Sequence, residues 1–245
     1  MNEKYTERFY RNRFKNDKLT YFTVKVKETD LSIGATGNLH EQALASILKY
    51  RAIVETYIEK HPEFLTSFSP IKSAPNASFL IRKMCDAAFA ANVGPMAAIA
   101  GAIAEAVGYD LLKYSDQVIV ENGGDVFIHC KEDIKVGIFS GDSPFKDKLA
   151  LKLKAEDMPL GVCSSSGKIG PSISFGKSDV VTIVSKSTYL ADAAATSVAN
   201  RLRTGEDMEA TIEYAKTIKG VTGVVAVIGN KIGAWGQVEL VKWSS

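Results

Sequence analysis

The chain has 245 residues, of which 46% are hydrophobic and 24% are charged, with a formal net charge of +2. This length can bury a large core, as one large domain or two intimately joined ones, and the composition is typical of a soluble globular protein. A nearly neutral chain does not require a polyanionic partner, and no nucleic-acid-binding module is recognisable, so we expect no nucleic-acid function.

Cysteine usage and the distribution of charge indicate the compartment. The three cysteines form no C-x-x-C pair, and an odd number argues against a disulfide framework. The N-terminus is charged, so no signal peptide is visible. Residues 87–104 carry no charge, but they are mostly Ala and Gly and are interrupted by Gly94-Pro95. We therefore expect two close-packed helical pieces, not a membrane span, and a cytoplasmic protein.

The N-terminal segment alternates aromatic or β-branched residues with charged ones. With Asn16-Asp17 as its turn, this alternation predicts a β-hairpin over about residues 5–27 that joins the core of one domain spanning 1–245. The same segment is rich in Lys and Arg, so a basic arm is the alternative. A basic, aromatic hairpin would suit the edge of a homodimer.

Further along the chain, helical and strand patterns alternate. Apolar residues at helical spacing predict helices over 38–60, 79–92, 95–112, 189–202 and 207–218. Strand-like runs occupy 116–130, 134–139, 148–153, 180–184, 221–229 and 237–243, with turns at Gly123-Gly124 and Gly229-Asn230. The pattern predicts an α+β fold with layered sheet and helices, in which both ends of the chain share one sheet.

A first polar constellation lies in the stretch VENGGDVF. Gly123 and Gly124 can adopt backbone conformations closed to other residues and point amides at a ligand, with Asp125 placed to accept a hydrogen bond or bind a cation. An ordinary β-turn built on Asn-Gly, with Asp125 exposed, explains the same residues.

A second constellation is GVCSSSGKIG, residues 161–170. It is not a Walker-type phosphate loop, because five residues separate Gly161 from Gly167 and Lys168 is followed by Ile169. The small residues Ser165, Ser166 and Gly167 have hydroxyls and amides suited to a phosphate or a ring edge. A serine-rich surface loop is the alternative, and the adjacent Cys163 is either a reactive thiol or a buried, inert one.

A third constellation is YLADAAATSVAN, in which Asp192 and Thr196 stand four residues apart. On a helix this spacing puts the carboxylate and the hydroxyl on one face, where they can supply two oxygen ligands to Mg²⁺. The alternative is that Asp192 lies near a helix start and interacts with its dipole, while Thr196 is merely packed. A carboxylate in so apolar a helix needs some partner.

The order of these motifs resembles the ApbE superfamily, whose typical members are FAD:protein FMN transferases, and more narrowly its shorter cytoplasmic branch. The resemblance covers residues 94–196 and implies a layered, T-fold-like arrangement of mixed or antiparallel sheet and helices. It implies that a flavin nucleotide contacts Gly123, Gly124, Asp125, Ser165, Ser166 and Gly167. It also implies a Mg²⁺ site made by Asp192, Thr196 and the Ala100 carbonyl, with Asp192 and Thr196 as catalytic residues, FAD as the flavin donor and a protein as acceptor.

Two departures from the family pattern leave the reaction open. The family helix reads D-x-G-x-x-[AS]-K-G, whereas this chain has PMAAIAGA, with Gly101 in place of the Lys. The family segment H-x-[IL]-D-P-x-T-G is replaced by KIGPSISFGKSD. The chain is therefore expected to be either a Mg²⁺-dependent FMN transferase or FAD-cleaving enzyme, or a non-catalytic flavin- or nucleotide-binding accessory protein. A serine hydrolase is disfavoured because no G-x-S-x-G elbow exists.

Overall fold

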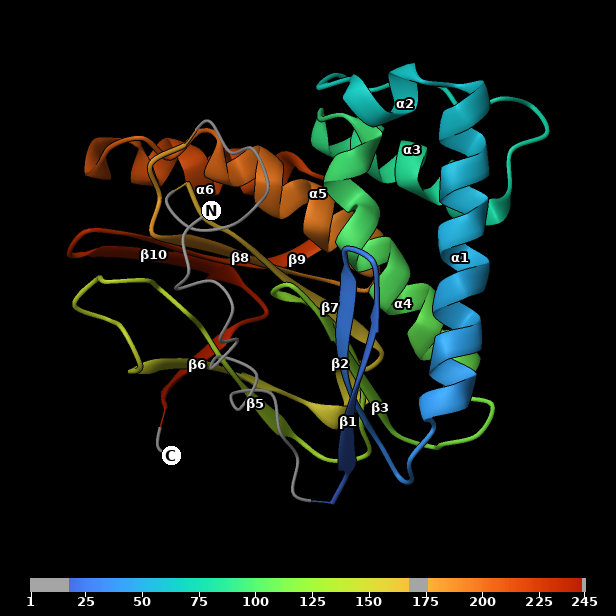
Figure 1. The fold of residues 1–245 in the computed structure, drawn as a ribbon. Helices are drawn as coiled ribbons and strands as arrows, with labels where there is room; N and C mark the ends of the chain where they lie inside the picture. Colours follow the sequence, from blue (N-terminus) through green and yellow to red (C-terminus); the bar gives the residue numbers. More distant parts are fainter. Residues whose placement is uncertain (1–17, 168–175, 244–245) are drawn as a thin grey trace.

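The structure is a computed structural model that describes residues 18–167 and 176–243 (Figure 1). Its main feature is an eight-stranded sheet in which every neighbouring pair of strands is antiparallel. In sheet order the strands are β1 (Thr20–Val26), β2 (Thr29–Ala35), β3 (Val118–Asn122), β4 (Asp125–His129), β7 (Leu160–Ser165), β8 (Val180–Ser185), β9 (Val221–Ile228) and β10 (Lys231–Gly236).

A smaller antiparallel sheet packs against the large one. Its order is β11 (Glu239–Lys242), β6 (Leu149–Leu153) and β5 (Ile134–Gly137). Figure 1 shows β5 and β6 on the face of β8, β9 and β10 that is opposite α5 and α6. The buried apolar residues between the sheets, such as Ile128, Leu151 and Val225, form one continuous cluster. This face of the large sheet is therefore covered by strands.

Helices cover the other face. They are α1 (His40–Lys60), α2 (Glu63–Thr66), α3 (Phe79–Ala91), α4 (Ile99–Leu111), α5 (Thr188–Ala199) and α6 (Met208–Thr217), with 3₁₀ turns η3 (Pro95–Ala98), η4 (Ala155–Asp157) and η5 (Gly205–Asp207). The alanine-rich α5 lies centrally: it contacts α3, α4 and α6 as well as β7 and β8. Eleven of its twelve residues are buried. Small side chains suit α5 because neighbours surround it on every side.

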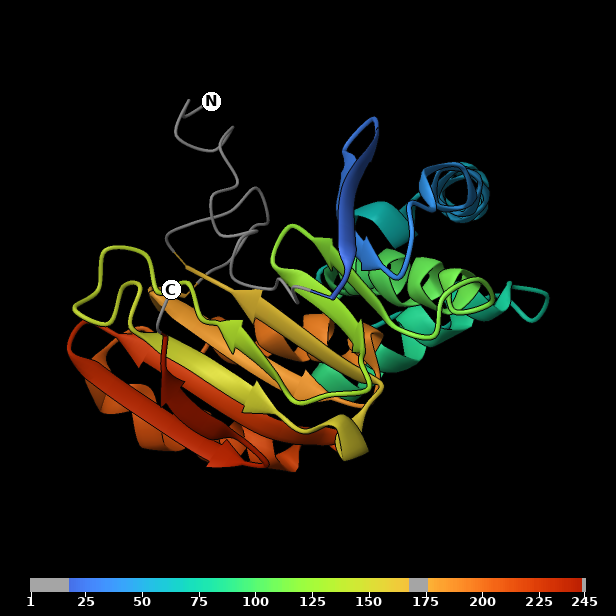
Figure 2. The ribbon, with the colours of Figure 1, turned by 90° about the horizontal axis from the view of Figure 1, so that it is seen from below.

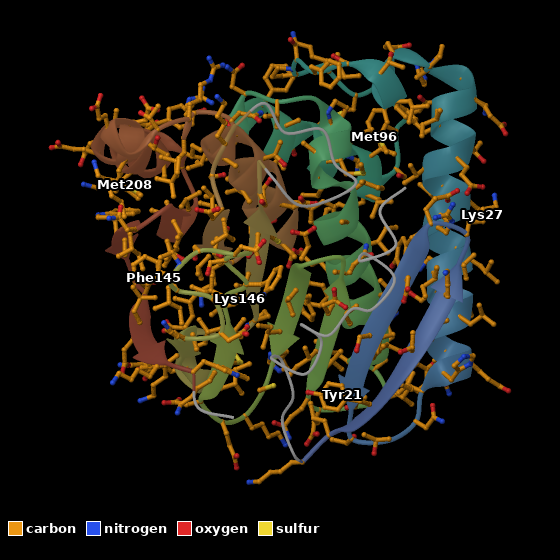
Figure 3. The ribbon with its side chains drawn as sticks, turned by 60° about the vertical axis from the view of Figure 1, so that its left-hand side comes forward. Tyr21, Lys27, Met96, Phe145, Lys146 and Met208 are labelled. Atoms are coloured by element: carbon orange, nitrogen blue, oxygen red, sulfur yellow. The ribbon has the colours of Figure 1, made fainter. Side chains whose placement is uncertain are left out.

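The β1–β2 hairpin stands at the edge of the sheet beside α1, at the end of the molecule away from β9 and β10 (Figure 2). Lys27 turns the hairpin with a positive φ of 52°. Its ammonium reaches Glu55 of α1, at 3.1 Å from each carboxylate oxygen, and Figure 3 places Lys27 at the hairpin tip next to that helix. At the opposite edge of the large sheet, Met208 of α6 packs against Gly233 of β10.

The architecture confirms the expected α+β fold with antiparallel sheet, and the predicted helices are all present within a few residues of the expected bounds. The structure also places a hairpin turn at Lys27, at the end of the expected 5–27 hairpin, so that β1 pairs with β2. The first arm of the predicted hairpin and its turn at Asn16-Asp17 lie outside the described residues. Strands near both ends of the chain do share the large sheet, but β1 and β10 form its opposite edges, and β11 belongs to the small sheet.

No single helix within residues 18–167 and 176–243 is long and apolar enough to cross a membrane. Only α3 and the segment 95–111 taken together are long and apolar enough for a span. The chain bends by 105° at the break between these two segments. The break follows Asn92, which ends α3 in a left-handed conformation, and Pro95 begins the 3₁₀ turn.

Candidate functional site

The site begins at the hairpin between β3 and β4. Asn122 pairs with Asp125, and Gly123 and Gly124 form the two-residue turn with φ angles of 67° and 105°. Two positive φ angles define the tight turn that fits the twist of a hairpin, and glycine adopts them without strain. The Gly124 amide donates to the carboxylate of Glu121 at 3.0 Å, so one turn amide is already engaged within the hairpin.

Asp125, the residue after the turn, points into the protein. Only 7% of its surface is exposed, in contrast to the exposed side chain that an ordinary hairpin turn would give it. It lies opposite Cys163 in the β4–β7 ladder, and the Cys163 thiol donates to the Thr188 carbonyl oxygen of α5 at 3.6 Å. Its Oδ1 atom is buried and has no hydrogen-bond partner among the described residues. A buried, unsatisfied carboxylate oxygen is costly, which indicates a site prepared for a ligand, cation or proton.

Asp192 reaches the same region from α5. Its Oδ2 atom accepts the Gly101 amide of α4 at 2.8 Å, and both groups are buried. Gly101 permits this approach because a Cβ atom there would lie 2.4 Å from the Thr188 carbonyl oxygen and 2.8 Å from the Asp192 Cβ. Asp192 is therefore not at the start of its own helix but at the first turn of α4, where free amides favour a carboxylate.

The Ala100 carbonyl completes the connection between α4 and the glycine turn. It accepts a hydrogen bond from the Asn122 side-chain amide at 3.0 Å. The peptide group that joins Ala100 to Gly101 is thus held on one side by Asn122 of β3 and on the other by Asp192 of α5. Three segments far apart in the sequence meet at this peptide.

Two buried carboxyl groups dominate the electrostatics of the site. Burial raises the pKa of Asp192 to about 7, although hydrogen bonds from the Gly101 and Ala100 amides act to lower it. Burial, and then the charge of Asp192, raise the pKa of Asp125 well above its usual range, and Glu121 adds to this effect. Two carboxyl groups that disfavour each other's ionisation are typical of sites that take up a proton or a cation.

The serine stretch differs from the expected loop. Ser164 and Ser165 belong to β7, and only Ser166 and Gly167 follow the strand. The Ser164 hydroxyl pairs with Thr182 of β8 at 2.8 Å, and the Gly167 amide donates to the Ser178 carbonyl at 3.1 Å. The small polar residues of this stretch did not indicate a strand. In the structure β7 packs against α5, and both Cys163 and Ser165 are buried.

Strand β7 runs along α5, so the predicted residues form an elongated group. Gly161 packs on Thr188 at the start of α5, while Gly167 packs on Gly176, which in turn packs on Ala199 at the end of α5. Asp125 and Asp192 therefore meet near the first half of the helix, and Ser166 and Gly167 lie toward its last turn. Thr196 lies between these regions and is half-buried.

The donor types in this group suit Mg²⁺, which is usually bound by one or two carboxylates together with phosphate oxygens of a substrate. Asp192 offers its second carboxylate oxygen, the Ala100 carbonyl has a second lone pair on the opposite side of the peptide from Asp192, and the buried Oδ1 of Asp125 has no hydrogen-bond partner among the described residues. No cluster of three or more His, Cys, Asp or Glu side chains within the described residues has a metal-binding arrangement. A cation here would thus depend on carbonyl, hydroxyl and ligand oxygens as well.

Two open surface cavities lie elsewhere. One of about 380 Å³ is bordered by Lys152, Lys154 and Gln237 between the two sheets, and one of about 420 Å³ is bordered by Tyr57, His61 and Ser78 beside α1. Neither is lined by Asp125 or Asp192. Both are wide and open, and neither contains a buried unsatisfied polar atom, so the carboxylate pair remains the stronger candidate.

Sequence reasoning did not single out Asn122, Cys163 as a neighbour of Asp125, or Glu105. Glu105, half-buried on α4, accepts a hydrogen bond from the Thr188 amide at the start of α5. One signal could have found it, because Glu105 is the first charged residue after Asp86 and stands in an apolar helix. The same reasoning that drew attention to Asp192 applies to it.

The fold is that of the ApbE flavin transferases. The flavin transferase ApbE from Vibrio cholerae superposes with a TM-score of 0.55 at 11% sequence identity, covering 89% of this chain and 96% of that one. The ApbE protein from Thermotoga maritima superposes with a TM-score of 0.53 at 13% identity, covering 88% and 96%. At such low identity the likeness establishes the shared fold.

The family follows from closer relatives. A family model described as "AbpE bacteria" matches residues 11–229. A UPF0280 protein of Methanocaldococcus jannaschii is 40% identical over 225 residues, covering 89% of this chain and 91% of that protein. Another from Methanocella arvoryzae is 38% identical over 218 residues, covering 87% of each. The chain belongs to this ApbE-like family, as the motif order predicts.

Proposed function

We propose that this protein binds a flavin nucleotide against the β3–β4 turn and β7, and that it transfers FMN from FAD to a hydroxyl group of a protein in a Mg²⁺-dependent reaction. The observation that carries the proposal is that Asp125 and Asp192, 67 positions apart in the chain, are both buried and both connected to the Gly123-Gly124 turn. Asp125 follows the turn directly, and Asp192 is linked to it through the Ala100–Gly101 peptide and Asn122. The ApbE fold and the motif order give this pair its interpretation.

The residues suit the chemistry of a pyrophosphate. The turn at Gly123-Gly124 exposes backbone to a ligand, since no atom lies within 4 Å of a Cβ built on Gly123. Ser166 and Gly167, at the other end of β7, offer hydroxyl and backbone groups to the more distant part of the nucleotide. An elongated site is what an extended dinucleotide requires.

In the proposed reaction an acceptor hydroxyl oxygen attacks the FMN phosphorus of FAD. A bond from that oxygen to phosphorus forms, the pyrophosphate bond breaks, AMP leaves with the bridging oxygen and the hydroxyl proton is released. Asp192, Thr196 and the Ala100 carbonyl would hold Mg²⁺, which when bound would neutralise charge on the phosphate oxygens. Asp192 also keeps the first turn of α4 in place through the Gly101 amide.

A second candidate, flavin-nucleotide binding without transfer, is favoured by one observation. Gly101 stands where the family pattern has Lys, and the contact with Thr188 and Asp192 leaves no room for a side chain. The cationic group that the resemblance would place here is therefore absent from this position, and tight binding without turnover is the expected result if that group is essential.

Incubation of the purified protein with FAD, MgCl₂ and a threonine-containing acceptor protein tests both candidates. Release of AMP together with covalently flavinylated acceptor, measured by chromatography and mass spectrometry, supports the transferase. Bound flavin without AMP supports the binding protein. Absence of both AMP and bound flavin, with the protein folded, contradicts both proposals.

Asp192→Asn is the informative variant in that assay. It keeps an oxygen acceptor for the Gly101 amide but removes the charge that would attract a cation. We expect it to abolish AMP release while the protein remains folded. Asp86→Asn, at a site on α3 outside the carboxylate pair, is the matched control and should behave like the wild type.

A further inference from the structure

Each of the helices α4 and α5 supplies a carboxylate that caps the N-terminus of the other. Asp192 of α5 accepts a hydrogen bond from the Gly101 amide in the first turn of α4, and the neighbouring Ala100 amide also acts to lower its pKa. In the opposite direction, Glu105 of α4 accepts a hydrogen bond from the Thr188 amide in the first turn of α5, and the neighbouring Tyr189 amide also acts to lower its pKa. The first amides of a helix have no partner within it, so each helix satisfies the N-terminal amides of the other.

The two contacts are in register. Glu105 lies four residues after Gly101, and Asp192 lies four residues after Thr188, which is about one helical turn in each case. Between the contacts, the helix backbones touch, because Gly101 has no side chain and abuts the Thr188 carbonyl. Two polar contacts one turn apart restrain both sliding and rotation of α5 on α4, which a single contact would not.

Neither helix has an N-cap residue of its own that could replace the carboxylate supplied by the other helix. The N-cap residue of α4 is Ala98, which makes no side-chain hydrogen bond. The N-cap residue of α5 is Ser187, whose hydroxyl accepts only the Leu190 amide, at 3.5 Å. Loss of Glu105 would therefore leave the amides of Thr188 and Tyr189 without their acceptor in a half-buried environment.

We propose that Glu105 is a positioning residue for the candidate site, holding the start of α5 on α4 so that the Asp192 carboxylate stays at the Ala100–Gly101 peptide. Glu105 acts through α5 and does not itself belong to the carboxylate pair. The proposal rests on the proposed function insofar as it concerns the same site, but its structural part can be tested without any flavin.

The first measurement is amide hydrogen exchange by NMR on three variants. Glu105→Gln retains an oxygen of the same reach, Glu105→Asp retains the charge but is one methylene shorter, and Glu105→Ala has neither. We expect Glu105→Gln to resemble the wild type, whereas Glu105→Asp and Glu105→Ala accelerate exchange at least tenfold at Thr188 and Tyr189. Because the two caps are coupled, exchange at Ala100 and Gly101 should accelerate as well.

The second measurement is FAD affinity in the presence of MgCl₂. Loss of a group that orients a ligating residue typically weakens binding roughly 10- to 100-fold, and we expect this for Glu105→Asp and Glu105→Ala, with rescue in Glu105→Gln. Leu111→Ala is the matched control, because Leu111 is fully buried on α4 but packs in the cluster with α1 and β2. It should lower the melting temperature without changing FAD affinity or exchange at Gly101.

The outcomes separate the two proposals. If the wild type binds no FAD, the proposed function fails, while the exchange data still decide the role of Glu105. Unchanged exchange at Ala100 and Gly101 in folded Glu105→Asp would overturn the positioning role. The same conclusion would follow if Leu111→Ala and Glu105→Asp weakened FAD binding equally, since the effect would then reflect stability alone.

Discussion

The Gly101 amide and the Asp192 carboxylate, 91 positions apart in the chain, meet at 2.8 Å in a buried contact between α4 and α5. This contact brings Asp192, the candidate cation ligand, to the Ala100–Gly101 peptide group. The carbonyl of the same peptide accepts a hydrogen bond from the side chain of Asn122, which precedes the glycine turn. The geometry of the candidate site therefore depends on how closely the two helices approach.

Gly101→Ala tests that approach. The added Cβ would lie 2.4 Å from the backbone oxygen of Thr188, which cannot rotate away. Alanine gains helix propensity of up to about 1 kcal/mol, but forced separation of packed elements costs about 1–3 kcal/mol and should also displace Asp192. We expect lower stability in urea denaturation and weaker FAD binding. Gly37→Ala, where no atom lies within 4 Å of the new Cβ, is the control and should be nearly neutral.

The carboxylate pair predicts an unusual pH dependence of stability. The pKa of Asp192 is raised from 3.8 to about 7 by burial, and that of Asp125 is raised as well. The folded state therefore holds protons that the unfolded state has released above about pH 4, so these groups stabilise the fold most at low pH. Their contribution is lost progressively as the pH rises from about 4 through 7.

Asp125→Asn should remove part of this dependence. The variant carries no ionisable group at position 125, so we expect it to be more stable than the wild type at pH 8, where ionising the buried Asp125 carboxyl group opposes folding. At pH 4.5 the two proteins should differ much less. Urea denaturation at several pH values measures this, and a constant difference between the proteins from pH 4.5 to 8 would contradict it.

Magnesium should stabilise the protein at alkaline pH. A cation that binds only the folded state adds about 1.4 kcal/mol at roughly ten times its Kd, and the added stability should fall toward pH 5 because protons compete for Asp192. Thermal unfolding with and without MgCl₂, at constant ionic strength, measures the effect. Asp192→Asn should lose it; an equal increase in Tm for that variant would assign the effect to another site.

The cysteines should be unreactive in the folded protein. Cys85, Cys130 and Cys163 are all buried thiols that form no disulfide. Burial raises the pKa of Cys85 to about 11, and burial together with the charges of Asp125 and Asp192 raises that of Cys163 well above its usual range. Thiolate is the reactive form, so Ellman's reagent should label the protein slowly at pH 8 and label three thiols after denaturation. Rapid labelling of Cys163 would show that the site opens.

Several elements could be predicted from the sequence because their signals are local. Helices such as α1 and α3 follow from apolar residues at helical spacing, and the β3–β4 hairpin follows from two glycines between strand-like runs. The motif order also indicated the ApbE-like fold, which the family match and the solved structures confirm. The expected roles in binding and catalysis remain predictions for all the site residues: Ala100, Gly123, Gly124, Asp125, Ser165, Ser166, Gly167, Asp192 and Thr196.

Tertiary structure decided the rest. The sequence determined that Asp192 and Glu105 are carboxylates in apolar helices and therefore need partners, but it carried no information on which amides those partners would be. Hydrogen bonds across 91 and 83 positions arise only when α4 and α5 pack, and their close approach depends on the space that a glycine leaves. Burial of Asp125 likewise follows from the strand and helix that cover it, because solvent exposure is a property of the folded chain and not of its local pattern.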